Sequence, residues 1–144
     1  MAVDFEVIAD NSAEVLKELD TQVQTALEAV GNQAVSNAKR NITAGVPRNA
    51  YSWYTPTGTL RNSVSHIVQG DTCYVGTNLE YAIYNEYGTG IYADGGKGRK
   101  SPWMYKDKAG NVHKTRGMKP LHFLKNAIQD NIEQYKKIIE QYLK

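Results

Sequence analysis

A long hydrophobic repeat near the N-terminus limits the folds open to this chain more than any other feature. Between residues 11 and 44 an apolar side chain recurs every three or four positions, which is the spacing of one face of an α-helix. At ~1.5 Å per residue, a helix of about thirty residues spans roughly 45 Å, which is more than one small domain covers. We therefore expect part of this apolar stripe to contact another subunit. The stripe consists of Leu16, Leu19, Val23, Leu27, Val30, Ala34, Ala38 and Ile42.

Residues at the ends and in the middle of this segment define the expected helix. Asn11, with Glu14 three residues later, fits a capping box in which Asn replaces the usual Ser or Thr. Gly45 and Pro47 predict the end of the helix. Gly31 costs about 1 kcal/mol relative to Ala inside a helix, so it predicts either the close approach of another element or a bend.

The remaining patterns predict one α+β domain over residues 1–144. We expect a small antiparallel sheet packed by the long N-terminal helix and a C-terminal helix. A protruding β-hairpin arm is expected within the glycine-rich segment 89–117, and Gly70-Asp71 predicts a tight turn between two other strands. Strands are expected at 3–7, 64–69, 72–75, 103–105 and 112–115, and one helix is expected from residue 118 to the C-terminus, covering the sheet.

The segment 74–90 is expected to run from a strand through a turn into a short aromatic helix. Thr77 or Asn78 is expected to cap this helix, and Glu80 to lie in its first turn. Gly88 is expected to end it. Three tyrosines at spacing three share one face, which indicates either a tyrosine-rich core helix or a hydrated subunit boundary. These residues are Tyr81, Tyr84 and Tyr87.

Charge is distributed unevenly, although the formal net charge is only +2. Residues 1–30 contain seven acidic residues and Lys17, a net charge of −6. Residues 97–119 contain eight basic residues and Asp107, a net charge of +7. Such polarity can join like subunits head to tail, or direct a basic arm toward a polyanion.

Nothing in the sequence carries a strong catalytic signature. The three histidines are far apart and lack the spacing of a zinc motif. The single cysteine, Cys73, lies in an apolar strand and is interpreted as a small buried hydrophobe. We expect no enzymatic activity and no cofactor or metal; a small hydrolase would lack a nucleophile and base that can be named. Because no apolar run approaches the roughly 20 residues of a membrane helix, we expect a soluble, intracellular protein.

Three segments together resemble a known protein family. They read PTGTLRNSV at 56–64, VGTNLEYAIYNEYGT at 75–89 and MKPLHFLKNAI at 118–128. In this order they resemble the tail-completion or head–tail joining proteins, also called minor tail proteins, of long-tailed bacteriophages. The third segment departs from the family pattern, since Lys119 stands where Arg is usual and one extra residue follows.

The resemblance implies a structural α+β subunit without enzymatic activity, assembled into a ring around the channel through which DNA passes. A hexamer is favoured by tail symmetry, and a dodecamer is the alternative. The implied partners are the head connector, the tail terminator or the tail tube, with non-specific contact to DNA and none to a membrane. The implied location is the neck or tail end of the virion, and the host cytoplasm during assembly.

Twelve residues are expected at subunit or partner interfaces. Basic residues of the arm are expected to meet a neighbour or line the ring. Arg61 is expected either to pair with Glu80 or Glu86 or to fix the turn before the strand, while Glu86 and Tyr87 anchor either the fold or the interface. The twelve are Trp53, Tyr54, Arg61, Tyr84, Glu86, Tyr87, Lys97, Arg99, Lys100, Trp103, Lys106 and Lys108.

An alternative function is a small nucleic-acid-binding module. The arm supplies cations for phosphates, and the loop at 48–56 holds Tyr51, Trp53 and Tyr54, whose rings can stack on bases. The same loop is otherwise packed over the sheet or exposed as a protein contact. A pI of only 8.6 and the confinement of basic residues to one segment weigh against this alternative.

Overall fold

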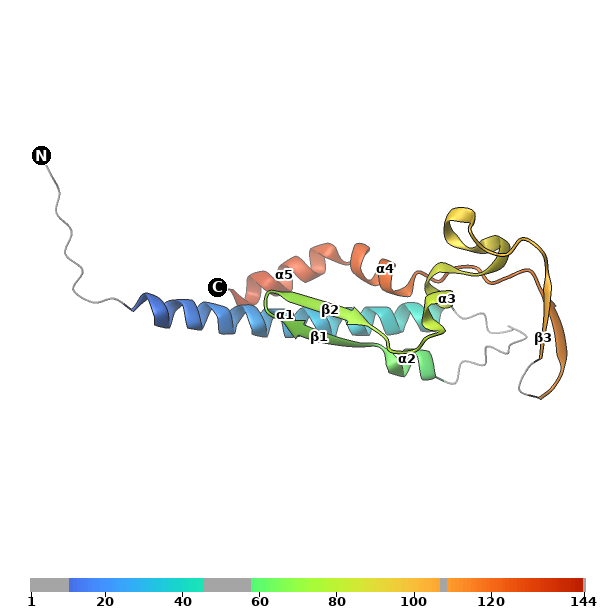
Figure 1. Ribbon diagram of the computed structural model, residues 1–144. Helices are drawn as coiled ribbons and strands as arrows, with labels where there is room; N and C mark the ends of the chain where they lie inside the picture. The colour runs from blue at the N-terminus through green and yellow to red at the C-terminus, as the bar shows by residue number, and fades with distance from the viewer. Residues whose placement is uncertain (1–10, 46–57, 107–108, 144) are drawn as a thin grey trace, which may run out of the picture.

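One helix forms the axis of the molecule. The computed structural model describes residues 11–45, 58–106 and 109–143. Helix α1 (Ser12–Gly45) runs without interruption for 34 residues, as the hydrophobic repeat predicts, and extends along most of the molecule in Figure 1. At ~1.5 Å per residue it is roughly 51 Å long. The strand expected at 3–7 and the aromatic loop at 48–56 lie outside the described residues.

A β-hairpin packs along α1. Strands β1 (Ser65–Gln69) and β2 (Thr72–Gly76) pair antiparallel, with Ser65 opposite Gly76 and Gln69 opposite Thr72. Gly70 has φ 62°, which supplies the left-handed conformation that the tight turn requires. The predicted hairpin is therefore confirmed, and the short helix α2 (Thr59–Ser63) leads into it.

The hairpin approaches α1 closely at Gly31. A Cβ at this position would lie 2.3 Å from Cδ2 of His66 and 2.9 Å from Sγ of Cys73. The imidazole of His66 is held there by its Nε2, which lies 2.7 Å from Oε2 of Glu28 on α1. Of the two roles predicted for Gly31, the structure supports the close approach of another element; α1 is continuous at this residue.

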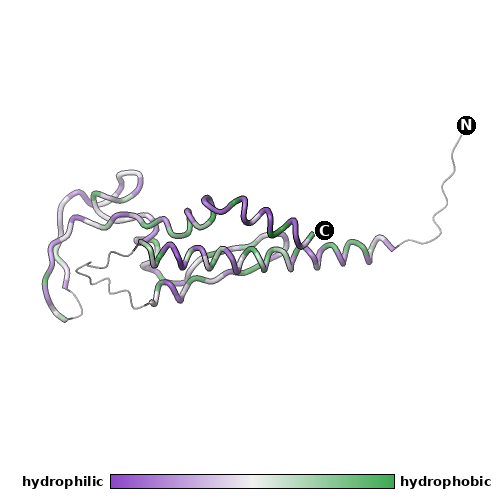
Figure 2. The backbone as a smooth tube through the Cα atoms, turned by 180° about the vertical axis from the view of Figure 1, so that it is seen from behind, coloured by the Kyte–Doolittle hydropathy of each residue, from purple (hydrophilic) through white to green (hydrophobic). Residues whose placement is uncertain are grey.

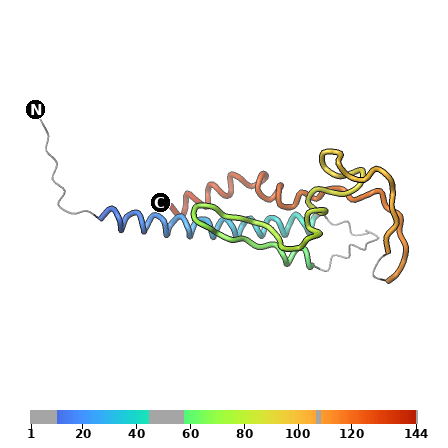
Figure 3. The backbone as a smooth tube through the Cα atoms, in the orientation of Figure 1, coloured from blue at the N-terminus to red at the C-terminus, as the bar shows by residue number. Residues whose placement is uncertain are grey.

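The C-terminal helices pack against α1, and Figure 3 shows them running back along it. They are α4 (Phe123–Gln129) and α5 (Ile132–Tyr142). This part of the chain was expected to cover the sheet, but its main contact is with α1. Helix α1 lies between the hairpin and the C-terminal helices and packs against both. Phe123 is fully buried in the core, which also contains Ala38, Ile42, Leu60, Val64, Ala82 and Ala127.

The expectation of one continuous C-terminal helix is also wrong. The backbone before α4 pairs with another segment instead of coiling, since Leu121 N–H donates to the Asn85 carbonyl and His122 N–H to the Glu86 carbonyl. His122 has φ 49°, a left-handed conformation that interrupts helical geometry. A second break falls between α4 and α5, where Asn131 has φ −126°. Apolar spacing does not detect such breaks, because the stripe continues across them.

A polar network with Asn37 and Tyr135 buried at its centre joins α1 to α4 and α5. Asn37 of α1 donates from Nδ2 to the hydroxyl of Tyr135 at 3.0 Å and to Oε1 of Gln134 at 3.1 Å, both on α5. The Tyr135 hydroxyl in turn donates to the carbonyl of Ala127 on α4. Because a buried polar group without a partner is costly, this network fixes the register of the C-terminal helices on α1.

The other end of the molecule carries the arm. Helix α3 (Ala82–Tyr87) leads into two single turns of 3₁₀-helix, η1 (Gly90–Tyr92) and η2 (Asp94–Gly96). Strands β3 (Trp103–Lys106) and β4 (Val112–Thr115) then form the predicted hairpin, which projects at the end remote from the start of α1 (Figure 1). The described residues thus form an α+β fold in which the two hairpins are separate two-stranded sheets.

We predict that Gly31→Ala destabilises the protein. In an unpacked helix this change would add about 1 kcal/mol of stability, but here the new methyl group displaces His66 and Cys73. We expect a net loss of about 1–3 kcal/mol, as for overpacked cores, measured by urea unfolding followed by circular dichroism. The matched control is Asn32→Ala on the exposed face of α1, which should be neutral or add up to about 0.7 kcal/mol. Equal stabilisation by both changes would contradict the close approach.

Candidate functional site

The turn before α3 is held by hydroxyl groups. The N–H of Leu79 donates to Oγ1 of Thr77 at 3.2 Å, and the same oxygen lies 2.5 Å from Oγ of Ser63. Thr77 therefore stabilises a turn instead of capping α3, whose N-cap is Tyr81 and has no side-chain hydrogen bond. The expectation that Thr77 or Asn78 caps the helix is therefore wrong. Glu80 was expected in the first turn of the helix but precedes it.

Gly88 ends α3 as predicted. Its φ is 79°, and its N–H donates to the Tyr84 carbonyl.

The three tyrosines of this region lie at the surface. Tyr81, Tyr84 and Tyr87 are between 42% and 57% exposed, whereas Asn85 and Glu86 face inward. The core-helix interpretation of these rings is therefore wrong. Exposed tyrosine rings combine apolar area with a polar hydroxyl, which suits a protein interface.

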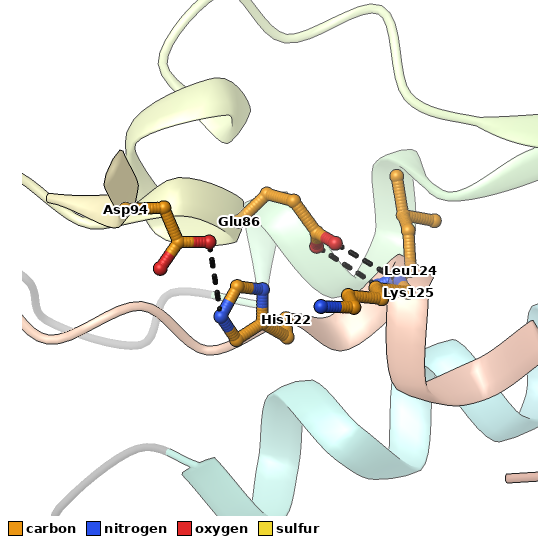
Figure 4. A network of polar contacts seen from close by, with 5 residues as sticks. All are labelled: Glu86, Asp94, His122, Leu124 and Lys125. Carbon is orange, nitrogen blue, oxygen red and sulfur yellow. Dashed lines mark hydrogen bonds and ion pairs between the residues drawn. The ribbon is translucent and has the colours of Figure 1, made fainter. Parts of the chain in front are cut away.

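Glu86 anchors the fold. Its side chain is only 6% exposed, and its two carboxylate oxygens accept hydrogen bonds from the N–H groups of Leu124 and Lys125, both at 2.9 Å (Figure 4). These amides belong to the first turn of α4 and have no partner within that helix. Glu86, which lies on α3, thus caps the N-terminus of α4. Of the two roles predicted for it, the structure supports the anchoring of the fold.

Arg61 does not bind Glu86. Both oxygens of Glu86 are used by backbone amides, and Arg61 is exposed on α2. Within the described ranges no ion pair joins Arg61 to Glu80 or Glu86, so the expected pairing is wrong there. The guanidinium therefore remains available at the surface.

Two of the segments that carry the family resemblance are hydrogen-bonded to each other. Thr89 donates its N–H to the Met118 carbonyl and accepts the Met118 N–H at Oγ1, both at 2.9 Å. The N–H of Ile91 donates to the Arg116 carbonyl at 3.0 Å. A Cβ on Gly90 would lie 1.8 Å from the Arg116 carbonyl oxygen, so glycine is required for this contact. These residues position the arm relative to α3.

The basic residues of the arm are exposed, as an interface requires. Lys97, Arg99, Lys100 and Lys106 all lie at the surface. The guanidinium of Arg99 lies 5.5 Å from the ring centroid of Trp103, within the range of a cation–π interaction. The expected interface residues Trp53, Tyr54 and Lys108 lie outside the described residues.

An apolar pocket of about 300 Å³ lies between α3 and the arm. The structure brings together here the predicted site residues Tyr84, Trp103 and Lys106, although they come from two separate segments. Tyr105 and Met118 also line this pocket, although the sequence did not single them out. Tyr105 shares the inner face of β3 with Trp103, so strand alternation could have identified it. The side chains that line the pocket include Tyr81, Tyr84, Trp103, Tyr105, Lys106 and Met118.

Glu86 and Tyr87 line a second groove, on the other side of α3. This groove has a volume of about 440 Å³ and is bounded by Phe123, Leu124 and Ile128 of α4. The structure therefore places Tyr84, Trp103 and Lys106 at one surface and Glu86 and Tyr87 at another. The exposed residues Arg61, Lys97, Arg99 and Lys100 line neither.

Two histidines contact carboxylates within the part of the chain that the structure describes. Besides His66 with Glu28, Nε2 of His122 lies 3.2 Å from Oδ2 of Asp94, which ties η2 to the start of α4 (Figure 4). Burial, and secondarily the carboxylate of Glu28, raises the pKa of the Cys73 thiol, which disfavours the thiolate.

Across residues 11–45, 58–106 and 109–143, no three His, Cys, Asp or Glu side chains gather as metal ligands. No helix in these ranges is long and apolar enough to cross a membrane.

The chain is therefore a small α+β protein whose distinctive features are an elongated helix, an exposed row of tyrosines and a basic arm. It belongs to the HK97-gp10-like family of bacteriophage proteins. The family model, described as "Bacteriophage HK97-gp10, putative tail-component", matches residues 6–88, more than half of the chain. The match confirms the resemblance and supports a role as a virion-associated tail component.

The matched region ends at the boundary between α3 and the arm. It includes α1, the first hairpin and α3, with the first resembling segment and nearly all of the second. The third resembling segment, at 118–128, lies beyond it. No curated protein and no solved structure matches the chain significantly.

We predict that Glu86→Gln destabilises the fold by about 1–3 kcal/mol, because an amide oxygen accepts one N–H while the amide nitrogen faces the other donor. Chemical denaturation of the full chain measures the change. Glu80→Gln is the matched control: Glu80 is exposed, and its substitution should change stability by no more than about 0.5 kcal/mol. Equal effects of the two substitutions would show that Glu86 does not cap α4.

Proposed function

We propose that this chain is a structural virion protein of a long-tailed phage or prophage, which completes the tail or joins head to tail as part of a ring around the DNA channel. The observation that carries the proposal is its membership of a phage tail-component family. Opposite charge at the two ends of an elongated subunit supports the ring. A role in assembly, without catalysis, agrees with this family.

The charge distribution suits contacts between unlike surfaces. The start of α1 carries Glu14, Glu18 and Asp20, while the arm carries an excess of lysine and arginine at the opposite end of the molecule (Figure 1). Contacts between two different patches generate closed rings when the rotation between subunits closes. We propose a hexamer, with a dodecamer as the alternative. The head connector, the tail terminator or the tail tube protein is the proposed neighbour along the channel.

A nucleic-acid-binding module is the second candidate function. It is favoured by the exposed cations of the arm and by Arg99 over the ring of Trp103, since guanidinium and indole groups both contact nucleic acids. Tight binding of the isolated monomer to short DNA, weakening steeply with salt, would favour this candidate. In the leading proposal the same cations face a neighbouring subunit or the ring lumen.

We predict that disrupting the gene in a phage or inducible prophage that encodes it leaves filled heads and tails that fail to form infectious particles. Electron microscopy of the lysate and infectious titre measure the defect. The intact chain supplied in trans should restore joined particles. Normal yields of joined, infectious virions without the protein would refute the proposed function.

We predict that reversing charge on the arm impairs this complementation. Lys97→Glu with Lys100→Glu should lower the restored titre at least about tenfold, because unfavourable charge contacts at an interface cost several kcal/mol. Lys136→Glu with Lys137→Glu on exposed positions of α5 changes the net charge equally and is the matched control. Circular dichroism verifies that both variants fold. Equal titres for the two variants would contradict the role of the arm.

A further inference from the structure

The first turns of α1 expose apolar side chains to solvent. Leu16 is 65% exposed, Val15 53% and Leu19 48%, and every described residue from 11 to 21 is exposed. Figures 1 and 2 show this part of the helix extending past the hairpin and the C-terminal helices. Helical stability in proteins comes mostly from burying an apolar face, so an isolated projecting segment of this kind gains from a partner.

The opposite end of the molecule offers a complementary recess. The aromatic pocket between α3 and the arm has a volume of about 300 Å³ and a lining that is predominantly apolar. Its side chains come from α3 and residues that flank it, from β3, and from the end of β4 and the segment that follows. Tyrosine and tryptophan are the residue types that most often anchor protein interfaces.

Charge distinguishes the two surfaces and selects how they pair. At 100° per residue, Glu18 and Asp20 lie roughly 100° to either side of the centre of the apolar stripe on α1. Lys106 lines the aromatic pocket, and Lys114 and Arg116 are exposed on the neighbouring part of the arm. Two stripes packed together would bring carboxylates close to carboxylates, and two pockets would bring cations close to cations. Stripe against pocket joins opposite charges.

We propose that the apolar stripe at the start of α1, formed by Val15, Leu16 and Leu19, docks in the aromatic pocket of a second copy of this chain. The contact is head to tail, so each copy gives one stripe and receives another. This proposal rests on the proposed ring and identifies the two surfaces that build it. It also accounts for a helix longer than the domain that supports it.

Disulfide trapping between two different variants tests the pairing in the full chain. In a Cys73→Ala background, Leu16→Cys is mixed with Tyr84→Cys under mild oxidation, and mass spectrometry identifies the mixed dimer. We expect it to form at least about tenfold faster than with Thr21→Cys in place of Leu16→Cys, because docking raises the effective concentration of the two thiols. Thr21 is exposed on the opposite face of α1, so it is the matched control.

Charge exchange provides a second measurement. Lys106→Glu in the Tyr84→Cys chain should slow trapping, and Glu18→Lys in the Leu16→Cys chain should restore its rate. Equal trapping of Leu16→Cys and Thr21→Cys would overturn the proposal. Faster formation of the Leu16→Cys homodimer than of the mixed dimer would also overturn it, in favour of symmetric helix pairing.

The outcomes separate this contact from the proposed function. Loss of joined particles on gene disruption, together with no preferential trapping, would keep the virion role and reject this contact. Preferential trapping together with normal virions in the absence of the gene would keep the contact and reject the role in tail completion.

Discussion

The packing of two separate layers against α1 is the constraint on which the rest of the structure depends. The hairpin lies against α1 at Gly31, where a methyl group would meet the imidazole of His66. The C-terminal helices are fixed on α1 by the hydrogen bonds of Asn37 with Tyr135 and Gln134. Neither two-stranded sheet would be stable alone, since isolated hairpins are marginal in water. The long helix therefore supplies the surface on which the first hairpin and the C-terminal helices become ordered.

The residues that carry the family resemblance hold the far end of this assembly together. Glu86 caps α4 through two backbone amides, and Thr89 exchanges hydrogen bonds with Met118. These contacts use the inward face of the segment and leave Tyr81 and Tyr84 exposed. One short stretch of chain thus orders the fold with one face and presents aromatic rings on the other. The inward face therefore stabilises the fold, and the outward face is left accessible for contacts with other molecules.

Local patterns predicted those elements whose formation depends on neighbouring residues. The extent of α1 followed from its apolar period, and both hairpins followed from alternation with glycine-containing turns. Predictions failed where a distant partner decided the outcome. The chain around His122 is not helical because its amides bond to the carbonyls of α3, and the carboxylate of Glu86 binds backbone amides of α4 instead of Arg61. The aromatic pocket was not predicted, because it joins segments that are remote in sequence; three of its lining residues, Tyr84, Trp103 and Lys106, were expected at interfaces.

The sequence by itself determined the long amphipathic helix, the two hairpins, the opposed charges and the resemblance to phage tail proteins, because each resides in the order and spacing of residues along one stretch of chain. Only the tertiary structure decided that α1 lies between the hairpin and the C-terminal helices, that Glu86 is a helix cap, and that tyrosines of α3 meet Trp103 across a pocket. Those features depend on distances between segments that are remote in sequence. Packing and backbone hydrogen bonds set these distances, and no local pattern encodes them.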